Sequence, residues 1–564
     1  MIENYRSIER CEFRPTKLTA LVGENNAGKS NILRALATVL GRDWVTVNSF
    51  QDNDFRDHDR SRDIVIELEF SPPLTHQAYQ GTDAVHVPVI RYKVTHYKVN
   101  TKRAKKGERR LETGCFDGAG KPVMALLEAP RTGKQRKYGP LVNIPADVRE
   151  QVPLIFVGSD RALEDQLPSG RYSMLRRLFE DVHDQLRATR VPAEVEGKSL
   201  EVSAQELFAR RLRAALDVLR IPAFNRLEEL LRTRSLENLG YDPVKDADKL
   251  RFHFELFDAM EFFKSIRLAF NEGGATIDAT CMGTGVQNAL VVAIFQAYEQ
   301  LRKRGAIFLI EEPEMYLHPH RQRFFYRTLS RLAEGNQLIY STHSPNFVTI
   351  PEFENVRVVY RDANDTTKVR ASSLLADNQL REKLRKEFDP ERNELFFARH
   401  VILVEGDTEK LAIPEYATRL TIDLNRQGCS VVEVGGKKSM KAFVEIVRSF
   451  GIPATVIFDS DSSQYGKNEK DKEAQCNEQL RSLQGEAVAV VENNPDYETV
   501  LRHDLGEDDY IALCQKYPGV SKAVQARLIA ADDASPVPEL ARRMLRRFLP
   551  LPKAGTVQPR PQGP

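Results

Sequence analysis

The segment LTALVGENNAGKSNILRALATVL (18–40) decides the fold of the first half of the chain. It begins with an apolar run and ends with apolar residues at helical spacing, which predicts a strand, a turn and a helix. Between them, GENNAGKS (23–30) matches the phosphate-loop pattern G-x-x-x-x-G-K-[ST]. Backbone N–H groups and the helix N-terminus would surround a phosphate there, with Lys29 neutralising it and Ser30 holding Mg²⁺. A glycine-rich turn without a ligand is the alternative.

Two carboxylates follow a second apolar run further along the chain. AIFLIEE (306–312) predicts a buried strand that ends in Glu311 and Glu312. Glu311 is placed to bind the magnesium or its water, and Glu312 to polarise an attacking water. STHSP (341–345) puts His343 just after the next predicted strand, where a sensor of the γ-phosphate is expected. The alternatives are two glutamates that cap a strand and a structural histidine.

A second group of acids follows two more apolar runs. VILVEGDTE (401–409) leads into Glu405, and TVIFDSD (455–461) ends in Asp459 and Asp461. In a parallel sheet both strand ends emerge at the same edge, so these carboxylates can converge. Close carboxylates repel one another unless a divalent cation neutralises them. An acidic surface loop is the alternative for either stretch alone, whereas the pair of acid-tipped strands favours a metal site.

Composition limits the class of protein. With 564 residues and 41% hydrophobic content, the chain can bury more than one core, because single cores stop growing at about 250–300 residues. A net charge of +2 with 29% charged residues indicates that any nucleic-acid face is local. The six cysteines include no C-x-x-C pair, which fits a reducing cytoplasm. No apolar run approaches the roughly 18 residues of a membrane span, so we expect a cytoplasmic protein without a membrane partner.

Four stretches together resemble the ATP-binding-cassette heads of the SMC and RecF type, over roughly residues 1–360: GENNAGKSNIL, MGTGVQNAL (282–290), EEPEMYLHP (311–319) and STHSP. In this resemblance MGTGVQ stands for the signature motif, with Thr284 in the place of the usual serine and Gly285 as the following glycine. Such a signature touches the γ-phosphate of nucleotide held by the opposite head. The resemblance therefore implies ATP between two protomers, in a homodimer or higher oligomer joined through the heads. Val286 departs from the second glycine, and Glu311 stands where many cassettes have aspartate, so ATP binding is expected rather than fast turnover.

The ATP-binding residues that follow from the loop and from this resemblance are Gly23, Asn25, Asn26, Gly28, Lys29, Ser30, Asn31, Thr284, Gly285, Glu311 and His343.

VEGDTE and DSD resemble the Toprim domain of topoisomerases, primases and related nucleases, over about residues 398–535. The resemblance implies that Glu405 is a metal ligand or general acid/base and that Asp459 and Asp461 bind metal. Glu409, one helical turn beyond Glu405, could reach the same face and complete a second metal site. Asp407 is expected to shape the turn. The implied ion is Mg²⁺, with Mn²⁺ or Ca²⁺ possible.

The pairing of these two motif sets resembles the OLD (overcoming lysogenization defect) nuclease family, which includes the nuclease subunit of Gabija antiphage systems. In that family a C-terminal lysine assists phosphodiester cleavage, which nominates Lys522 in SKAVQARLIA; a solvated helix residue is the alternative. Lys553 is a weaker candidate, and Glu498 resembles a further acidic position. The implied chemistry is a two-metal in-line displacement, with the lysine offsetting charge at the phosphate.

The predicted fold class is α/β: an ATP-binding-cassette head with a helical insertion, followed by a Toprim α/β domain. The predicted segments are residues 1–172 (N-terminal lobe of the head), 173–265 (helical arm or dimerisation insertion), 266–390 (C-terminal lobe), 391–548 (Toprim domain) and 549–564 (disordered tail). A turn-rich insertion is expected at 71–84 and a mobile charged loop at 462–475.

Three basic segments are candidates for contacts to DNA phosphates, or else solvated surface: 102–110, 131–137, and ARRMLRRF (541–548) with Arg542, Arg543, Arg546 and Arg547. We therefore predict an ATP-binding, metal-dependent DNA endonuclease or nickase in antiphage defence or DNA processing. The alternative is a non-nucleolytic ATPase clamp that bridges DNA and keeps the Toprim domain as a structural part. The family resemblance also allows a helicase-like partner protein.

Overall fold

A six-stranded sheet forms the centre of the first half of the protein. The computed structural model describes residues 1–41, 44–79, 82–97, 105–128, 137–158, 163, 167, 173–195, 198–218, 221–239, 241–249, 258–272, 275–301, 305–374, 391–461 and 467–549. The strands of the central sheet, in spatial order, are β17 (Thr367–Ala371), β16 (Val356–Arg361), β3 (Leu18–Val22), β15 (Gln337–Ser341), β14 (Ile307–Glu311) and β9 (Leu154–Val157). Neighbouring strands from β16 to β9 are parallel, and β17 is antiparallel to β16. The predicted strands at 18–23 and 306–312, and the strand predicted just before His343, are confirmed.

The predicted strand, turn and helix at 18–40 are confirmed, because β3 leads through the phosphate loop into α1 (Lys29–Leu40). Two glycines make the tight turn possible. A Cβ on Gly23 would lie 2.0 Å from the Val359 carbonyl oxygen, and one on Gly28 would lie 2.2 Å from Thr367 Oγ1. Both glycines also have positive φ, 140° and 109°, a region that residues with side chains rarely adopt. The loop is therefore pressed against the β16–β17 hairpin.

A second, antiparallel sheet covers α1 on its other side. Its order is β2 (Ile8–Cys11), β1 (Ile2–Tyr5), β4 (Ile64–His76), β5 (Val85–His96) and β6 (Arg109–Phe116). The prediction of a turn-rich insertion at 71–84 is wrong for its first part, because SPPLTH belongs to β4. The strand accommodates the two prolines at a shift in register between Glu69 and Leu74, where the ladder with β5 is interrupted. The hairpin of β7 (Met124–Glu128) and β8 (Lys137–Pro140), and α2 (Ala146–Glu150), complete this part.

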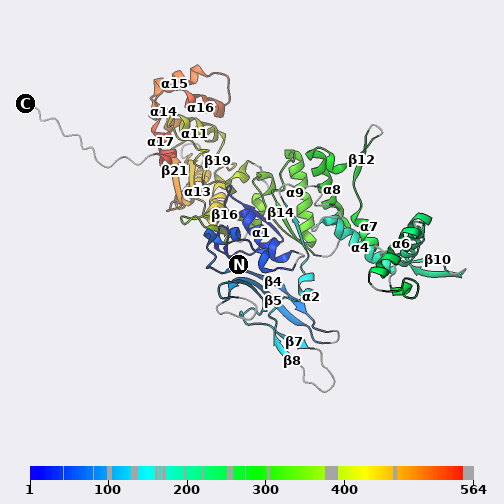
Figure 1. Ribbon diagram of the computed structural model, residues 1–564. Coiled ribbons are helices and arrows are strands. Elements are labelled where there is room, and N and C mark those ends of the chain that lie inside the picture. The colour runs from blue at the N-terminus through cyan, green and yellow to red at the C-terminus, as the bar shows by residue number, and fades with distance from the viewer. Residues whose placement is uncertain are drawn as a thin grey trace, which may run out of the picture.

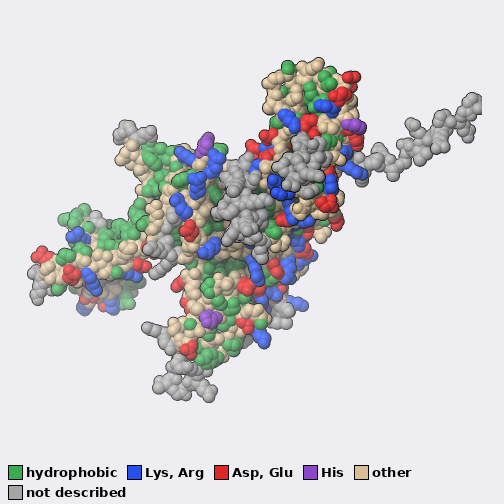
Figure 2. All heavy atoms as spheres, turned by 180° about the vertical axis from the view of Figure 1, so that it is seen from behind, with side chains coloured by type: hydrophobic (Ala, Val, Ile, Leu, Met, Phe, Trp, Pro, Cys, Tyr) green, Lys and Arg blue, Asp and Glu red, His purple; other side chains and the backbone are tan. Residues whose placement is uncertain are grey.

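A projecting arm follows, and Figure 1 shows it extending from one side of the head. It contains α4 (Met174–Ala188), α5 (Ala204–Asp217), α6 (Pro222–Asn238) and α7 (Ala259–Lys264), which confirms the predicted helical character. An unpredicted hairpin, β10 (Arg190–Val195) and β11 (Lys198–Ser203), interrupts it. Figure 2 shows apolar side chains over this arm, and α6 exposes Leu227, Leu230 and Leu231. Its use as a dimerisation surface stays a prediction.

The chain returns to the head through the hairpin of β12 (Ala269–Glu272) and β13 (Ala275–Asp278), the helix α8 (Thr284–Leu301) and the helix α9 (Pro319–Gly335). Aromatic side chains join these helices to the sheet. Phe295 of α8 packs edge-on against Phe325 of α9, with ring centroids 5.4 Å apart, and both are buried. The central sheet thus has α8 and α9 on the face away from α1.

The C-terminal part is a smaller sheet of four parallel strands: β19 (Cys429–Glu433), β18 (His400–Val404), β20 (Ala454–Asp459) and β21 (Val488–Asn493). Its helices are α11 (Asp407–Arg419), α12 (Lys437–Ser449), α13 (Lys467–Arg481), α14 (Tyr497–Leu505), α15 (Glu507–Lys516), α16 (Lys522–Ala531) and α17 (Glu539–Met544). The predicted alternation of strand and helix is confirmed. Figure 1 shows α14 to α17 at the far end from the arm.

The mobile charged loop predicted at 462–475 is wrong for residues 467–475, which form the first part of α13. Three predictions concern residues that the structure does not describe: residues 462–466 of the charged loop, the domain boundary near 390 and residues 550–564 of the tail.

The two halves share one hydrophobic core, which runs from the head strands into α12 and β20. Phe396, just before β18, packs edge-on against Phe450 with ring centroids 5.5 Å apart. The buried Asn393 donates hydrogen bonds to the carbonyls of Pro345 (2.9 Å) and Val348 (2.8 Å) in the head. The loops that follow the head strands and the loops that follow β18 and β20 are therefore held in a fixed position relative to each other. None of the described helices is long and apolar enough to span a membrane.

His400, the first residue of β18, generates a prediction about pH. Its ring is buried, contacts Thr455 Oγ1 at 2.9 Å and packs edge-on against Phe548. Burial, reinforced by Arg547, lowers its pKa to about 4, whereas an unfolded histidine has a pKa of about 6.5. Between these two values the unfolded chain binds more protons, so stability falls as pH falls. Between pH 7 and pH 4.5 we expect the Tm of His400→Gln to fall less than the Tm of the wild type. The difference in the free energy of unfolding lost over this range is up to about 3 kcal/mol.

The matched control is His503→Gln, since the side chain of His503 is 90% exposed. It should keep the pH slope of the wild type. Equal slopes for His400→Gln and the wild type would contradict the assignment.

Candidate functional site

Lys29 occupies the centre of the phosphate loop. Its side chain is buried, and Nζ donates hydrogen bonds to the carbonyl oxygens of Gly23 (2.9 Å) and Glu24 (2.8 Å). Burial lowers the pKa of Lys29 to about 8, while the nearby carboxylates of Glu312 and Glu314 oppose that shift. A buried ammonium whose hydrogen bonds go to neutral carbonyls is costly. A bound phosphate would supply the missing negative charge, so the loop fits a nucleotide.

Glu311 and Glu312 stand at the end of β14, beside this lysine. Glu311 is 4% exposed, and Arg34 Nε of α1 lies 3.6 Å from its carboxylate. Glu312 has a φ of 45°, in the left-handed region, and its N–H donates to the Ser341 carbonyl at 2.9 Å. Non-glycine residues in this region are uncommon and cluster at functional turns. The structure thus brings both predicted acids to the edge where the phosphate loop lies.

Glu314 is a residue that the sequence reasoning left out of the site. Its carboxylate accepts hydrogen bonds from Thr342 Oγ1 (2.8 Å) and from the backbone N–H of His343 (2.5 Å). Burial raises the pKa of Glu314, and burial together with the positive charge of Lys29 lowers that of His343. Glu314 therefore ties the loop after β14 to the histidine loop after β15. The sequence signal that could have identified Glu314 is its place as the third acid of the stretch EEPE (311–314).

Two of the remaining loop residues bond to side chains that line a neighbouring hollow. Asn25 and Asn26 are exposed, and Arg361 Nε donates to the Asn26 carbonyl at 3.0 Å. Asn31 Nδ2 donates to Ser7 Oγ at 2.7 Å. The hollow is lined by Arg6, Ser7, Asn53, Phe55, Arg56, Asp57, His58, Arg361 and Asp365. Ser30 is half-buried in the first turn of α1.

The signature segment lies at the start of α8. Thr284 is the first residue of this helix and is exposed, and Gly285 follows it. Gln287 holds the turn by donating from Nε2 to the carbonyls of Thr280 (2.9 Å) and Met282 (2.8 Å). The segment is therefore presented on the surface at a helix N-terminus, where backbone N–H groups can face an anion.

Glu405 and Asp459 meet at the end of the smaller sheet. They follow the neighbouring parallel strands β18 and β20, and the Asp459 N–H donates to Glu405 Oε2 at 3.3 Å. Asn493, at the end of β21, donates to Asp459 Oδ1 at 3.0 Å. Burial raises the pKa of Glu405, and it raises that of Asp459 to about 6. The predicted convergence of these two strand ends is seen in the structure.

Glu409 joins this pair from α11. It is 3% exposed, and burial followed by repulsion from Asp459 raises its pKa to about 8. Glu405 and Glu498 add to that repulsion. Asp407, in contrast, is the exposed first residue of α11, where a carboxylate favours the helix dipole.

Lys522 reaches the same acids from the C-terminal segment. It begins α16, and its Nζ lies 2.9 Å from Glu498 Oε2 of α14. Asp459 and Asp496 also act on its charge. The lysine is largely exposed, so its ammonium stands at the rim, between the buried acids and solvent. Lys553, the weaker candidate, lies outside the described residues.

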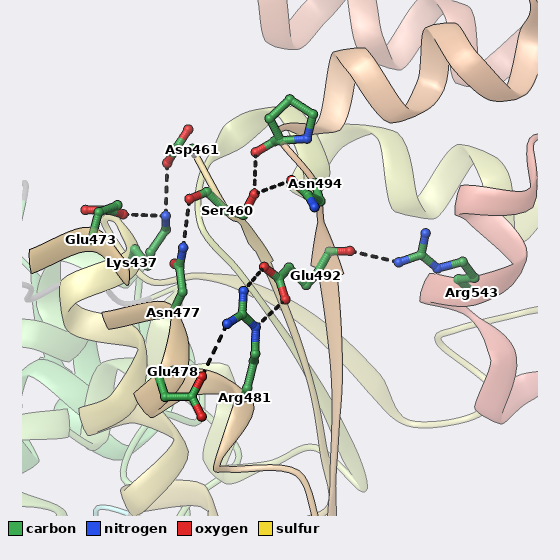
Figure 3. A network of polar contacts seen from close by, with 11 residues as sticks. Lys437, Ser460, Asp461, Glu473, Asn477, Glu478, Arg481, Glu492, Asn494 and Arg543 are labelled. Atoms are coloured by element: carbon green, nitrogen blue, oxygen red, sulfur yellow. Dashed lines mark hydrogen bonds and ion pairs between the residues drawn. The ribbon is translucent and has the colours of Figure 1, made fainter. Parts of the chain in front are cut away.

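Asp461 is held on the other side of Glu405, by a lysine that the sequence reasoning did not select. Figure 3 shows Lys437 pointing at two carboxylates, with Nζ 3.0 Å from Asp461 Oδ2 and 2.5 Å from Glu473 Oε1. Asp461 has a φ of 52°, and its N–H donates to the Pro495 carbonyl at 2.8 Å. The sequence signal that could have identified Lys437 is the pair of glycines, Gly435 and Gly436, directly before it.

These residues fit a divalent cation by their chemistry. Carboxylate oxygens are the ligands that Mg²⁺, Mn²⁺ and Ca²⁺ prefer, and Glu405, Glu409 and Asp459 offer them within one buried, mutually repelling group. Among the described residues, no three Asp, Glu, His or Cys side chains form a ready-made metal cage. Ligation would have to draw these acids together.

The basic segments differ in how their arginines are used. In the first, Arg109 lies 3.5 Å from Asp52 and Arg110 pairs with Glu112 of the same strand, so both already have acidic partners. Residues 102–104 and 131–136 lie outside the described residues. The arginines of the third segment, Arg542, Arg543, Arg546 and Arg547, are all exposed. That segment remains the better candidate for phosphate contacts.

Comparison with known proteins supports the assignment of both parts of the chain, the ATPase head and the Toprim domain. Residues 1–118 and 159–348 match an AAA ATPase domain, and residues 396–461 match the TOPRIM domain of overcoming lysogenization defect protein-like proteins. The chain is 32% identical over 469 residues to the OLD nuclease of Thermus scotoductus, covering 82% of this chain and 81% of that protein. It is 23% identical to the Old nuclease of Escherichia phage P2, covering 82% and 76%. It is 21% identical to the endonuclease GajA of Bacillus cereus, covering 83% and 75%. An ATPase head and a Toprim domain that share a core, together with this level of identity, show that the chain belongs to the OLD nuclease family.

Proposed function

We propose that this protein is a divalent-metal-dependent DNA endonuclease or nickase whose head binds ATP, acting in antiphage defence or DNA processing. The observation that carries the proposal is that the half-buried Glu405 and Asp459, at the ends of parallel strands, meet beside the buried Glu409 of α11. A surface loop would leave these acids solvated and apart. The names of the relatives, two OLD nucleases and an endonuclease, support the same chemistry.

In the proposed reaction, Glu405, Glu409 and Asp459 would hold one ion, and Glu405 and Asp461 would hold a second. Bound metal would orient the attacking water and stabilise the leaving 3′-oxygen. Lys522 stands at the exposed rim, where its ammonium offsets the charge that develops on the scissile phosphate. The exposed arginines of α17 and the segment after it bind the DNA backbone nearby, without reading bases.

The head is proposed to hold ATP with Mg²⁺ between two protomers. Lys29 and Ser30 face the phosphates, Glu311 the magnesium, and Glu312 the attacking water. Thr284, which is exposed at the start of α8, and Gly285 after it would meet nucleotide on a partner head. The domain limits given above, the cytoplasmic location and a helicase-like partner stay predictions.

Glu405→Ala should abolish cleavage and spare ATP binding. Removal of the carboxylate shared by both proposed metal positions is expected to lower plasmid nicking about 100-fold or more, measured with Mg²⁺ or Mn²⁺, with and without ATP. Glu486→Ala, at an exposed glutamate of the same domain, is the matched control and should cut like the wild type. A wild type that leaves supercoiled DNA intact under every condition would instead favour the non-nucleolytic clamp.

Lys29→Ala should remove ATP binding and leave the metal site assembled. Loss of the charged donor is expected to weaken ATP on the order of 10- to 100-fold, measured with a fluorescent nucleotide. Lys17→Ala, at an exposed lysine just before β3, should bind ATP normally. The two-site picture fails if Lys29→Ala loses Mn²⁺ binding at the Toprim acids, or if Glu405→Ala loses ATP.

A further inference from the structure

Lys437 is a buried cation inside the acidic site. Its side chain is only 4% exposed, and it forms ion pairs with Asp461 and Glu473. Figure 3 shows the ammonium between these two carboxylates, which come from the loop after β20 and from α13. The charge of Glu405 also acts on it. A positive charge is therefore already present on one side of the acids assigned to metal.

The backbone fixes Lys437 in this place. Gly435 and Gly436 have positive φ values of 74° and 106°, and the Gly436 N–H donates to the Glu405 carbonyl at 3.1 Å. The next residue, Lys437, begins α12. The turn that positions this lysine is thus hydrogen-bonded to the residue that carries the shared carboxylate.

The other side of the site has no such buried cation among the described contacts. Burial, followed by repulsion from Asp459 and Glu405, raises the pKa of Glu409. Burial and repulsion from Glu405 likewise raise the pKa of Asp459. The lysine on that side, Lys522, is 68% exposed and pairs with Glu498. Negative charge is therefore left uncompensated at Glu409 and Asp459, and largely compensated at Asp461 and Glu473.

We propose that the Lys437 ammonium is the resident cation of the second metal position, so that the two divalent ions bind with unequal affinity. The first ion binds beside Glu409 and Asp459, and the second binds only when it displaces the ammonium from Asp461. This inference rests on the proposed metal site. Lys437 acts here as a positioning residue, which keeps Asp461 in place through Nζ until the second ion arrives.

The physical reason is competition for the same charge. A divalent ion and an ammonium cannot share Asp461 closely without repelling each other, and this repulsion is poorly screened in a buried site. The displaced ammonium still has Glu473 as a partner, so displacement is costly without being forbidden. The wild type should therefore bind the two divalent ions with unequal affinity. Once the ammonium is removed, the two affinities should become nearly equal.

The test is a titration with Mn²⁺ in the absence of nucleotide and DNA, in which free Mn²⁺ is followed by electron paramagnetic resonance. The wild type should bind one ion tightly and a second at least about tenfold more weakly. Lys437→Met, which keeps an unbranched apolar chain, should tighten the second step by at least about tenfold. Lys441→Met is the matched control, because Lys441 lies on the same helix and is 50% exposed; it should leave both steps unchanged.

Three results distinguish failure of this inference from failure of the proposed site. If the wild type binds no Mn²⁺, the metal site itself fails. If the wild type binds two ions equally well, or if Lys437→Met leaves the weak step unchanged, the role of Lys437 is overturned while the metal site stands. Asp461→Asn provides a second variant that keeps Lys437: it should remove the weak step only, and loss of the tight step would overturn the assignment. Glu409→Gln should remove the tight step.

Discussion

Both candidate sites depend on one constraint: parallel strands end at the same edge of a sheet. The interiors of β3, β14 and β15, and of β18 and β20, are buried and largely apolar, so the acids and the phosphate loop lie where these strands end. In each sheet those loops lie side by side. The phosphate loop therefore meets Glu312 and His343, and Glu405 meets Asp459, although each pair is far apart in sequence.

The second common feature is charge that is buried before any ligand is present. Lys29 is enclosed with neutral carbonyls as its hydrogen-bond acceptors, and Glu409 is enclosed with other acids. Either arrangement disfavours the ionised form of the group, as the lowered pKa of Lys29 and the raised pKa of Glu409 indicate. Such groups gain most from a ligand of opposite charge. The head thus favours an anion and the Toprim edge favours a cation, from the same physical cause.

Sequence reasoning succeeded where the signal was local. An apolar run that ends in a glycine-rich loop or in acids predicted β3, β14, β18 and β20 and the residues that follow them. It missed Glu314 and Lys437, because their importance comes from contacts with Thr342 and Asp461, which only the folded chain brings close. For α13 the high density of charge suggested a loop, since a helix without an apolar stripe leaves no hydrophobic period to detect.

The relation between the two sites is set by packing more than by charge. Arg399, just before β18, donates from Nη2 to Glu24 Oε2 of the phosphate loop at 2.6 Å, so one ion pair links the neighbourhood of ATP to the strand that ends in Glu405. Both side chains are well exposed, and exposed ion pairs contribute only about 0–1 kcal/mol. The shared core around Phe396 and Phe450, with the two hydrogen bonds of Asn393, excludes water and resists compression. The shared core, and not the exposed ion pair, therefore fixes the head loops relative to the strand that ends in Glu405.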